Sequence, residues 1–150
     1  MPTDSGLEQV MLVDGHSLIF AWEDLRALHR RSGLAARSEL ARRLRRYADS
    51  SGVHVVLVYD GAGMRIEEEA GNGIQVMYSS RGLTADDVIE RLVRHYKGHY
   101  ALSVATRDLA EAHAVMAEGA MVVSPRTLKE LLEGEEEAFR ARLERQRRRT

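Results

Sequence analysis

The sequence contains no cysteine. A disulfide framework and thiolate metal sites are therefore excluded, and any metal ion has to be held by oxygen or imidazole ligands. This absence also favours a cytoplasmic protein. The sequence has no run of about 18 apolar residues. Residues 1–6 have neither the basic region nor the apolar region of a signal peptide. Neither membrane spanning nor secretion is indicated.

The motifs of nucleotide-binding and zinc enzymes are also missing. No G-x-x-x-x-G-K-[ST] phosphate loop occurs, and the stretch at residues 61–65 lacks the third glycine of a dinucleotide fingerprint. The six histidines form no HExxH or HxH pair, which argues against zinc hydrolysis. Without a phosphate loop or an Asp-x-Asp motif, a phosphatase or a flavodoxin-like binder of small ligands is disfavoured.

The chain is long enough for one domain. Its 150 residues are 44% hydrophobic, and a chain of this length buries roughly two-thirds of its unfolded surface. We find no internal repeat and no low-complexity linker. We expect an N-terminal tail over residues 1–8, a single domain over residues 9–132 and a charged helical extension over residues 133–150.

Five short runs rich in β-branched residues alternate with segments of helical period. The runs predict strands at residues 10–14, 53–60, 73–79, 100–106 and 119–124. The other segments predict a short helix after Asp14 and longer helices at residues 34–49, 84–97, 109–118 and 127–149. Several runs are apolar on both faces, which is typical of a parallel sheet covered by helices. The pattern predicts a three-layer α/β/α fold with an open, mainly parallel, five-stranded sheet.

Acidic residues stand where three of these strands end. Asp14 ends the first strand, Asp60 ends the second, and Asp108 comes two residues after the fourth. Because the carboxyl ends of parallel strands form one edge, where ligands bind, we expect these carboxylates to converge. A single aspartate in such a place is often only a turn or cap residue, so the prediction depends on their conjunction.

Two further acids stand at the start of the predicted helix 84–97. Thr84 and Asp87 have the spacing of a capping box, which gives Asp87 a structural explanation. On a helical wheel Asp86 borders the apolar stripe, whereas Asp87 points further outward. Asp86 is therefore the better candidate for a functional site.

Carboxylates gathered at one crevice repel one another unless a cation compensates their charge. Mg²⁺ and Mn²⁺ prefer oxygen ligands, and such an ion can activate water and stabilise charge on a phosphodiester. The sequence therefore predicts a Mg²⁺ or Mn²⁺ site formed by aspartates: Asp14, Asp60, Asp86, Asp87 and Asp108.

The net charge of −1 hides two arginine clusters, and local fields matter more than the sum. Because an acidic site repels a phosphate backbone, a nucleic-acid partner would have to be held by basic rims. The candidates are Arg37, Arg42, Arg43, Arg45, Arg46, Arg107, Arg140 and Arg147. The C-terminal cluster follows a run of glutamates, so this segment is either a solvated helix or an RNA-facing arm. Phe20 and Trp22 are interpreted as core residues rather than a base-stacking platform.

Five segments occur in a fixed order: DGHSLIFAW, VYDG, VMYSSRGLTADDVIERL, VATRD and GAMVVSPRTLKELL. Together they resemble the YacP-like branch of the NYN domains, within the PIN-like nuclease superfamily. The resemblance covers residues 9–132. It implies a three-layer fold with a parallel sheet, a Mg²⁺ or Mn²⁺ site built from acids at the strand ends, and endonucleolytic cleavage of single-stranded RNA.

The resemblance also assigns residues to roles. Asp14 matches the acid of the family's first strand, Asp86 the acid of its TAD helix start, and Asp108 the acid after VAT. Asp60 matches an acid after the second strand. The family usually has Asp-Gly-Tyr-Asn where this chain has Asp-Gly-His-Ser, so the Ser17 hydroxyl replaces an asparagine amide. Serine is tolerated there in the related 5′-nuclease branch, and Ser17 would hydrogen-bond water or phosphate.

We therefore expect a cytoplasmic, metal-dependent RNA endonuclease, with mRNA as a candidate substrate and the ribosome as a candidate partner. The alternative is a non-catalytic RNA- or ribosome-binding module on the same scaffold. Acids at every matching position argue against this alternative. Family members often need a large RNA-containing partner to present the substrate, so inactivity of the isolated protein would not separate the two.

Overall fold

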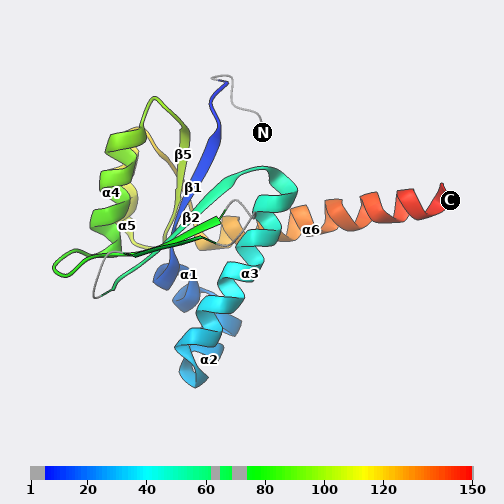
Figure 1. Cartoon of the computed structure of the whole chain (residues 1–150), viewed down its shortest axis with the longest axis horizontal. Coiled ribbons are helices and arrows are strands. Elements are labelled where there is room, and N and C mark those ends of the chain that lie inside the picture. The colour runs from blue at the N-terminus through cyan, green and yellow to red at the C-terminus, as the bar shows by residue number, and fades with distance from the viewer. Residues whose placement is uncertain (1–5, 62–64, 69–73, 150) are drawn as a thin grey trace.

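The computed structural model describes residues 6–61, 65–68 and 74–149, with residues 65–68 as backbone. These parts form one sheet and the helices around it (Figure 1). The strands are β1 (Gln9–Asp14), β2 (His54–Tyr59), β3 (Arg65–Glu68), β4 (Ile74–Tyr78), β5 (Ala101–Ala105) and β6 (Met121–Val123). The helices are α1 (Gly15–Ala21), α2 (Glu23–Arg31), α3 (Gly33–Ser51), α4 (Ala85–Tyr96), α5 (Leu109–Ala117) and α6 (Pro125–Arg148).

The sheet has the strand order β3-β4-β2-β1-β5-β6. The five predicted strands are all present and pair in parallel, which confirms the predicted α/β class. The strand β3 adds an antiparallel edge beside β4 and was not predicted. Its four residues include two glutamates and no β-branched run, so nothing in the sequence distinguishes it from a loop.

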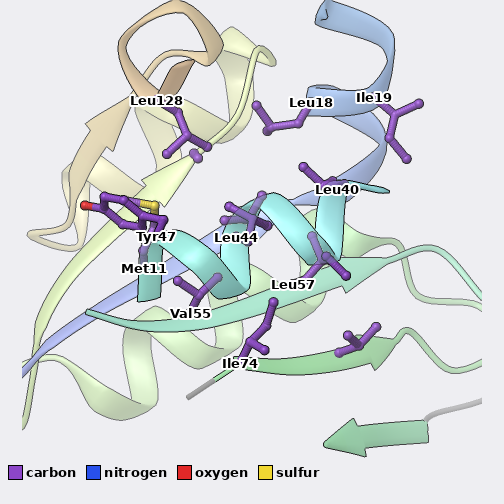
Figure 2. Close-up of a cluster of buried hydrophobic side chains, with 14 of the residues drawn as sticks. Met11, Leu18, Ile19, Leu40, Leu44, Tyr47, Val55, Leu57, Ile74 and Leu128 are labelled. Atoms are coloured by element: carbon purple, nitrogen blue, oxygen red, sulfur yellow. The ribbon is translucent and has the colours of Figure 1, made fainter. Parts of the chain in front are cut away.

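Helices cover both faces of the sheet. Alternate residues of β1 point to opposite faces, as the period of a strand requires. Met11 and Val13 pack in a core with α1, α2, α3 and the start of α6, part of which Figure 2 shows. Val10 and Leu12 pack in a second core with α4 and α5. The predicted three-layer arrangement is therefore confirmed.

The helix α2 was not predicted, and it meets α1 at a buried tryptophan. Trp22 is 5% exposed, and its Nε1 donates a hydrogen bond of 3.0 Å to the carbonyl oxygen of Pro125 at the start of α6. Trp22 is thus a core residue, as predicted, whereas Phe20 is only half-buried.

The helix α6 continues without a break across residue 132, the predicted end of the domain, and its C-terminal part projects away from the sheet (Figure 1). Within the described ranges, no helix is both long and apolar enough to cross a membrane.

Candidate metal centre

Asp14 lies where β1 turns directly into α1. It is the last residue of the strand and the N-cap of the helix, and it is 7% exposed. Its carboxylate accepts hydrogen bonds from the Ser17 backbone N–H at 3.4 Å and from the Ser17 hydroxyl at 3.0 Å. These contacts fix the orientation of the carboxylate, as side chains at an N-cap do.

Gly15 allows this turn because no side chain fits there. A Cβ atom at position 15 would lie 2.1 Å from a ring carbon of Tyr59. The ring of Tyr59 is buried at the end of the neighbouring strand β2. The sequence Asp-Gly therefore places the carboxylate at the carboxyl edge of the sheet, with the helix packed closely behind it.

A chain of hydroxyls connects Asp14 to the next strand end. The Ser17 hydroxyl lies 3.3 Å from the hydroxyl of Thr106, the residue that follows β5. Thr106 donates a hydrogen bond of 2.8 Å to Oε2 of Glu111 on α5. Ser17, Thr106 and Glu111 are all buried. The carboxyl ends of β1 and β5 therefore share one polar, enclosed site.

Three carboxylates converge in this site. Asp14, Asp86 and Glu111 each offer one oxygen atom, and these oxygens all lie within 4.8 Å of one another. We call these three residues the acid cluster. In the described part of the chain, none of the ion pairs involves any of the three. Within the described residues, their negative charge is therefore not paired with a cationic side chain.

Two carboxyls of the acid cluster have raised pKa values. Burial, followed by the neighbouring carboxyls of Asp86 and Asp14, raises the pKa of Glu111 to about 10. Burial also raises the pKa of Asp86, and the charges of Asp14 and Asp108 act in the same direction. At neutral pH, and without a cation, at least one carboxyl of the cluster therefore carries a proton.

The cluster fits a hard divalent cation. Oε1 of Glu111 is buried and has no hydrogen-bond partner among the described residues. A buried acceptor without a donor is costly and requires an explanation. All the side chains that converge offer carboxylate oxygens, the ligands that Mg²⁺ and Mn²⁺ prefer. A divalent cation at this point would satisfy the free oxygen and compensate the gathered charge.

Asp108 stands at the rim of the acid cluster rather than among its three members. It is exposed and is the N-cap of α5, where its Oδ1 accepts hydrogen bonds from Ala110 N at 2.9 Å and Glu111 N at 3.2 Å. A hydrogen bond with Asp108 also raises the pKa of Asp86, so the two carboxyls are neighbours. Asp108 thus orients the helix that carries Glu111.

In the structure, Asp60 and Asp87 both accept hydrogen bonds from backbone N–H groups at the start of α4. Oδ1 of Asp60 accepts a hydrogen bond of 2.6 Å from Ala85 N, the first residue of α4. Asp87 and Thr84 form the predicted capping box, in which Thr84 N donates to Asp87 at 2.9 Å and Asp87 N donates to Thr84 at 3.1 Å. Neither aspartate is brought into the group of three carboxylates.

Glu111 and Thr106 were missed in the sequence. Glutamate in a helix usually lies on a solvated face, and α5 carries few polar residues that would reveal its inward side. One signal was present, because Glu111 shares the buried face of α5 with Val115, four residues later. Glu111 lies on the apolar stripe of a helix that directly follows Asp108, and this pattern predicts a carboxylate that points toward the site.

Most of the predicted RNA-binding arginines of α3 have acidic partners. Arg43 pairs with Asp24 of α2 and, at 2.8 Å, with Glu39, and its guanidinium lies 5.9 Å from the ring centre of Trp22. Arg42 pairs with Glu39 at 2.7 Å. Glu136 of α6 lies 3.1 Å from Arg46 and 4.0 Å from Arg140. Arg45 lies half-buried on α3, and Arg147 is exposed near the end of α6.

Arg37 and Arg107 lie closer to the acid cluster. Arg107 is exposed, directly follows Thr106, and holds its guanidinium 5.9 Å from the ring centre of Phe20 on α1. Arg37 belongs to the first half of α3, and its charge acts on His16. Burial is the main reason that the pKa of His16 is lowered, and the charge of Arg37 adds to this effect.

Comparisons with known proteins agree with this geometry. The family model of the YacP-like NYN domain matches residues 11–150. The protein YacP of Bacillus subtilis (strain 168), described as uncharacterized, is 31% identical over 123 residues, which are 79% of this chain and 72% of the relative. A crystal structure of a point mutant of Rae1 (YacP) from Bacillus subtilis has a TM-score of 0.79 at 29% identity, covering 91% of this chain and 82% of that one. A second crystal structure of Rae1 (YacP) has a TM-score of 0.77 at 28% identity, covering 91% and 80%.

Proposed function

The chain belongs to the YacP-like NYN domain family, and from that premise we propose that it is a divalent-metal-dependent endonuclease of single-stranded RNA. NYN domains are a PIN-like nuclease family, so a nuclease-type, RNA-related function is the one that the fold serves. The observation that carries the proposal is the buried acid cluster, whose carboxylates have no cationic side chain beside them in the described residues.

Asp14, Asp86 and Glu111 would hold the ion, with Asp108 at the rim. When bound, a divalent cation there supplies neutralisation of phosphate charge and acidification of water. The chain's own residues hold the site in shape. The backbone N–H and the hydroxyl of Ser17 donate to the two oxygens of Asp14, and the hydroxyl of Thr106 donates to one oxygen of Glu111, so both buried carboxylates are held in place. Such supporting hydrogen bonds orient the ligands of a metal site.

The substrate follows from charge and shape. An acidic site repels a phosphate backbone, so affinity has to come from basic groups around it. Arg107 and Arg37 are the nearest candidates, and the arginines at the C-terminal end of α6 offer a second basic surface. No groove-reading helix motif is found in the sequence, which favours single-stranded RNA. We also place the protein in the cytoplasm, with ribosome-bound mRNA as its candidate substrate.

Cleavage of an end-labelled single-stranded RNA in Mn²⁺ or Mg²⁺ tests the proposal. The RNA is offered both alone and as mRNA engaged by ribosomes. We expect the wild type to produce internal cuts, EDTA to stop them, and Asp14→Asn to lower the rate by about 10³-fold. Asp49→Asn, at an exposed acid of α3, is the matched control and should cleave like the wild type.

Two results would overturn the assignment. Cleavage that survives Asp14→Asn would show that the acid cluster is not the active site. Binding of RNA that is indifferent to metal, with no cleavage in either context, would instead favour a non-catalytic RNA- or ribosome-binding module. Replacing both Arg42 and Arg43 by glutamate then tells whether such a module binds RNA through α3.

A further inference from the structure

A row of rings lies beside the acid cluster. It begins at Tyr78 on β4, passes through Tyr59 on β2 and His16 and Phe20 on α1, and ends at His29 on α2. Successive ring centres are 5.6, 5.1, 6.1 and 4.9 Å apart. Tyr59 is buried, whereas His16, Phe20 and His29 are half-buried and keep part of their surface in contact with solvent.

Phe20 and Arg107 stand just outside the acid cluster. Phe20 lies one helical turn after Ser17 on α1, and Arg107 directly follows Thr106. Ser17 and Thr106 are themselves joined, hydroxyl to hydroxyl, at 3.3 Å. The contact between Phe20 and Arg107 therefore joins α1 to the segment after β5, as the Ser17–Thr106 contact does. Phe20 and Arg107 are more exposed than Ser17 and Thr106.

Arg107 has not been neutralised by the protein. Over residues 6–61, 65–68 and 74–149, the ion pairs seen do not include it, although the carboxylate of Asp108 is next to it in the sequence. Its guanidinium instead faces a ring at 5.9 Å, at the outer limit of a cation–π contact. An exposed cation and a half-exposed ring at the rim of an acidic site are thus both available to a ligand.

We propose that Phe20 and Arg107 form a clamp for one unpaired nucleotide of the RNA. The base stacks on the ring of Phe20, and the Arg107 guanidinium binds its face or its phosphate, so that a neighbouring phosphodiester lies over the acid cluster. Aromatic rings and arginines in a cationic path are the groups that bind single strands without reading their sequence. The proposal rests on the nuclease function proposed above and makes Phe20 and Arg107 positioning residues.

Replacement of the ring tests the clamp. Phe20→Leu keeps the apolar bulk but removes the aromatic face, and Phe20→Tyr keeps both. Binding of a fluorescein-labelled single-stranded RNA is followed by fluorescence anisotropy in EDTA, where no cleavage occurs. We expect Phe20→Leu and Arg107→Ala each to weaken binding about tenfold, and Phe20→Tyr to stay within about twofold of the wild type. In Mn²⁺ the same losses should appear in KM, with kcat nearly unchanged.

The matched controls replace the same residue types far from the site. Phe139 is exposed on α6, and Arg94 is exposed at the end of α4 remote from the acid cluster. We expect Phe139→Leu and Arg94→Ala to leave RNA affinity unchanged. A single-stranded DNA of the same sequence should lose affinity in Phe20→Leu to the same degree, because stacking reads the base and not the ribose.

An RNA with all of its bases removed isolates the stacking contribution. On this strand we expect the wild type to bind no better than Phe20→Leu, because only the ring-dependent part of the affinity is lost. Equal affinity of wild type and Phe20→Leu for the intact RNA would overturn the clamp while leaving the nuclease function in place. If the wild type neither binds nor cleaves RNA in any context, the nuclease function itself fails. Should the leucine variant not fold, Phe20→Met takes its place in every comparison.

Discussion

Two charged regions of this molecule hold their acids in opposite ways. In the groove of about 570 Å³ between α3 and α6, acids and arginines alternate at the surface. Hydrogen bonds from Arg42 and Arg43 there hold the pKa of Glu39 at about 2. In the acid cluster, burial raises the pKa of Glu111 to about 10. The same functional group is thus fully charged where the chain supplies a cation and keeps its proton where it does not.

The comparison separates charges that the fold has already paired from charges that await a ligand. Arg43 touches acids of two helices and the ring of Trp22, so it contributes to the packing of α2 on α3. The acid cluster has an unpartnered oxygen and no such neighbour among the described residues. An external cation is therefore expected at the cluster, while the arginines of the groove already have carboxylate partners and have less need of an anionic ligand.

Among the variants that test this comparison, Glu111→Gln should produce the largest effect. The variant removes one ligand, so we expect cleavage to fall by about 10²- to 10³-fold. It also removes a carboxyl that is costly to charge, so the metal-free protein should gain about 1 to 3 kcal/mol of stability near pH 8. Urea unfolding in EDTA measures the gain in stability. Urea unfolding in Mn²⁺ measures the loss of metal binding, because we expect Mn²⁺ to stabilise the wild type but not the variant. A variant that is less stable in EDTA would contradict this account.

The pH dependence of stability should follow from the same residue. Glutamate has a reference pKa of 4.5, and in the folded state the pKa of Glu111 is about 10. Between these values the folded protein holds a proton that the unfolded chain has released, so its stability falls as pH rises. The slope cannot exceed about 1.4 kcal/mol per pH unit for one proton.

Urea unfolding between pH 7 and pH 9 in EDTA measures this slope. The lowered pKa of His16 acts in the opposite direction, and this contribution fades as the pH rises above neutral, so the slope of Glu111 is read toward the upper end of the interval. Glu111→Gln should flatten the profile, and Mn²⁺ should stabilise the wild type more at pH 9 than at pH 7. Stability that rises across this interval in the wild type would show that the cluster is already neutralised.

Asp87 should behave as a cap rather than a ligand. Asp87→Ala removes one half of the capping box at the start of α4, so we expect the melting temperature to fall by roughly 2 to 5 °C. Cleavage and the stabilisation by Mn²⁺ should stay within about twofold of the wild type, in contrast to Asp86→Ala. A loss of metal binding in Asp87→Ala would restore the prediction that Asp87 is a ligand.

Arg43 should show the smallest effect. Its ion pairs are partly exposed, and such pairs contribute little each. With its contact to Trp22 included, we expect Arg43→Ala to lower stability by about 1 kcal/mol. RNA affinity should change less than twofold, measured by anisotropy beside Arg107→Ala. A loss of affinity as large as that of Arg107→Ala would mean that the groove also binds RNA.

The sequence predicts most of the fold because the buried strands are continuous apolar runs. Each such run became a strand, and the helix periods between them placed the covering layers. The failures are short or polar elements. The strand β3 forms because it pairs with β4 at the edge of the sheet, and α2 because Leu25 packs into the core. Neither cause is local, so neither is visible in the residues alone.

The site residues also differ in whether local sequence or tertiary packing determines their position. Asp14 and Asp86 could be predicted, because a strand end and an apolar stripe determine where they point. Glu111 could not, since its burial depends on how α5 packs on the sheet. Asp87 follows the local rule of the capping box, whereas Asp60 contacts the start of α4 from the end of β2, through a contact that only the tertiary fold brings about.

The contact between Gly15 and Tyr59 sets the mutational tolerance of this edge of the molecule. Since even a methyl group at position 15 would run into the tyrosine ring, that position accepts no other residue unless β2 gives way. The neighbouring positions differ from each other: His16 is half-buried against the rings of Tyr59 and Phe20, whereas Ser17 is buried and hydrogen-bonds to Asp14. In a saturation library of residues 14–17 we therefore expect activity to require Asp14, Gly15 and a hydrogen-bonding side chain at position 17, while position 16 tolerates more change, so that part of the rim can diverge while the carboxylate stays in place.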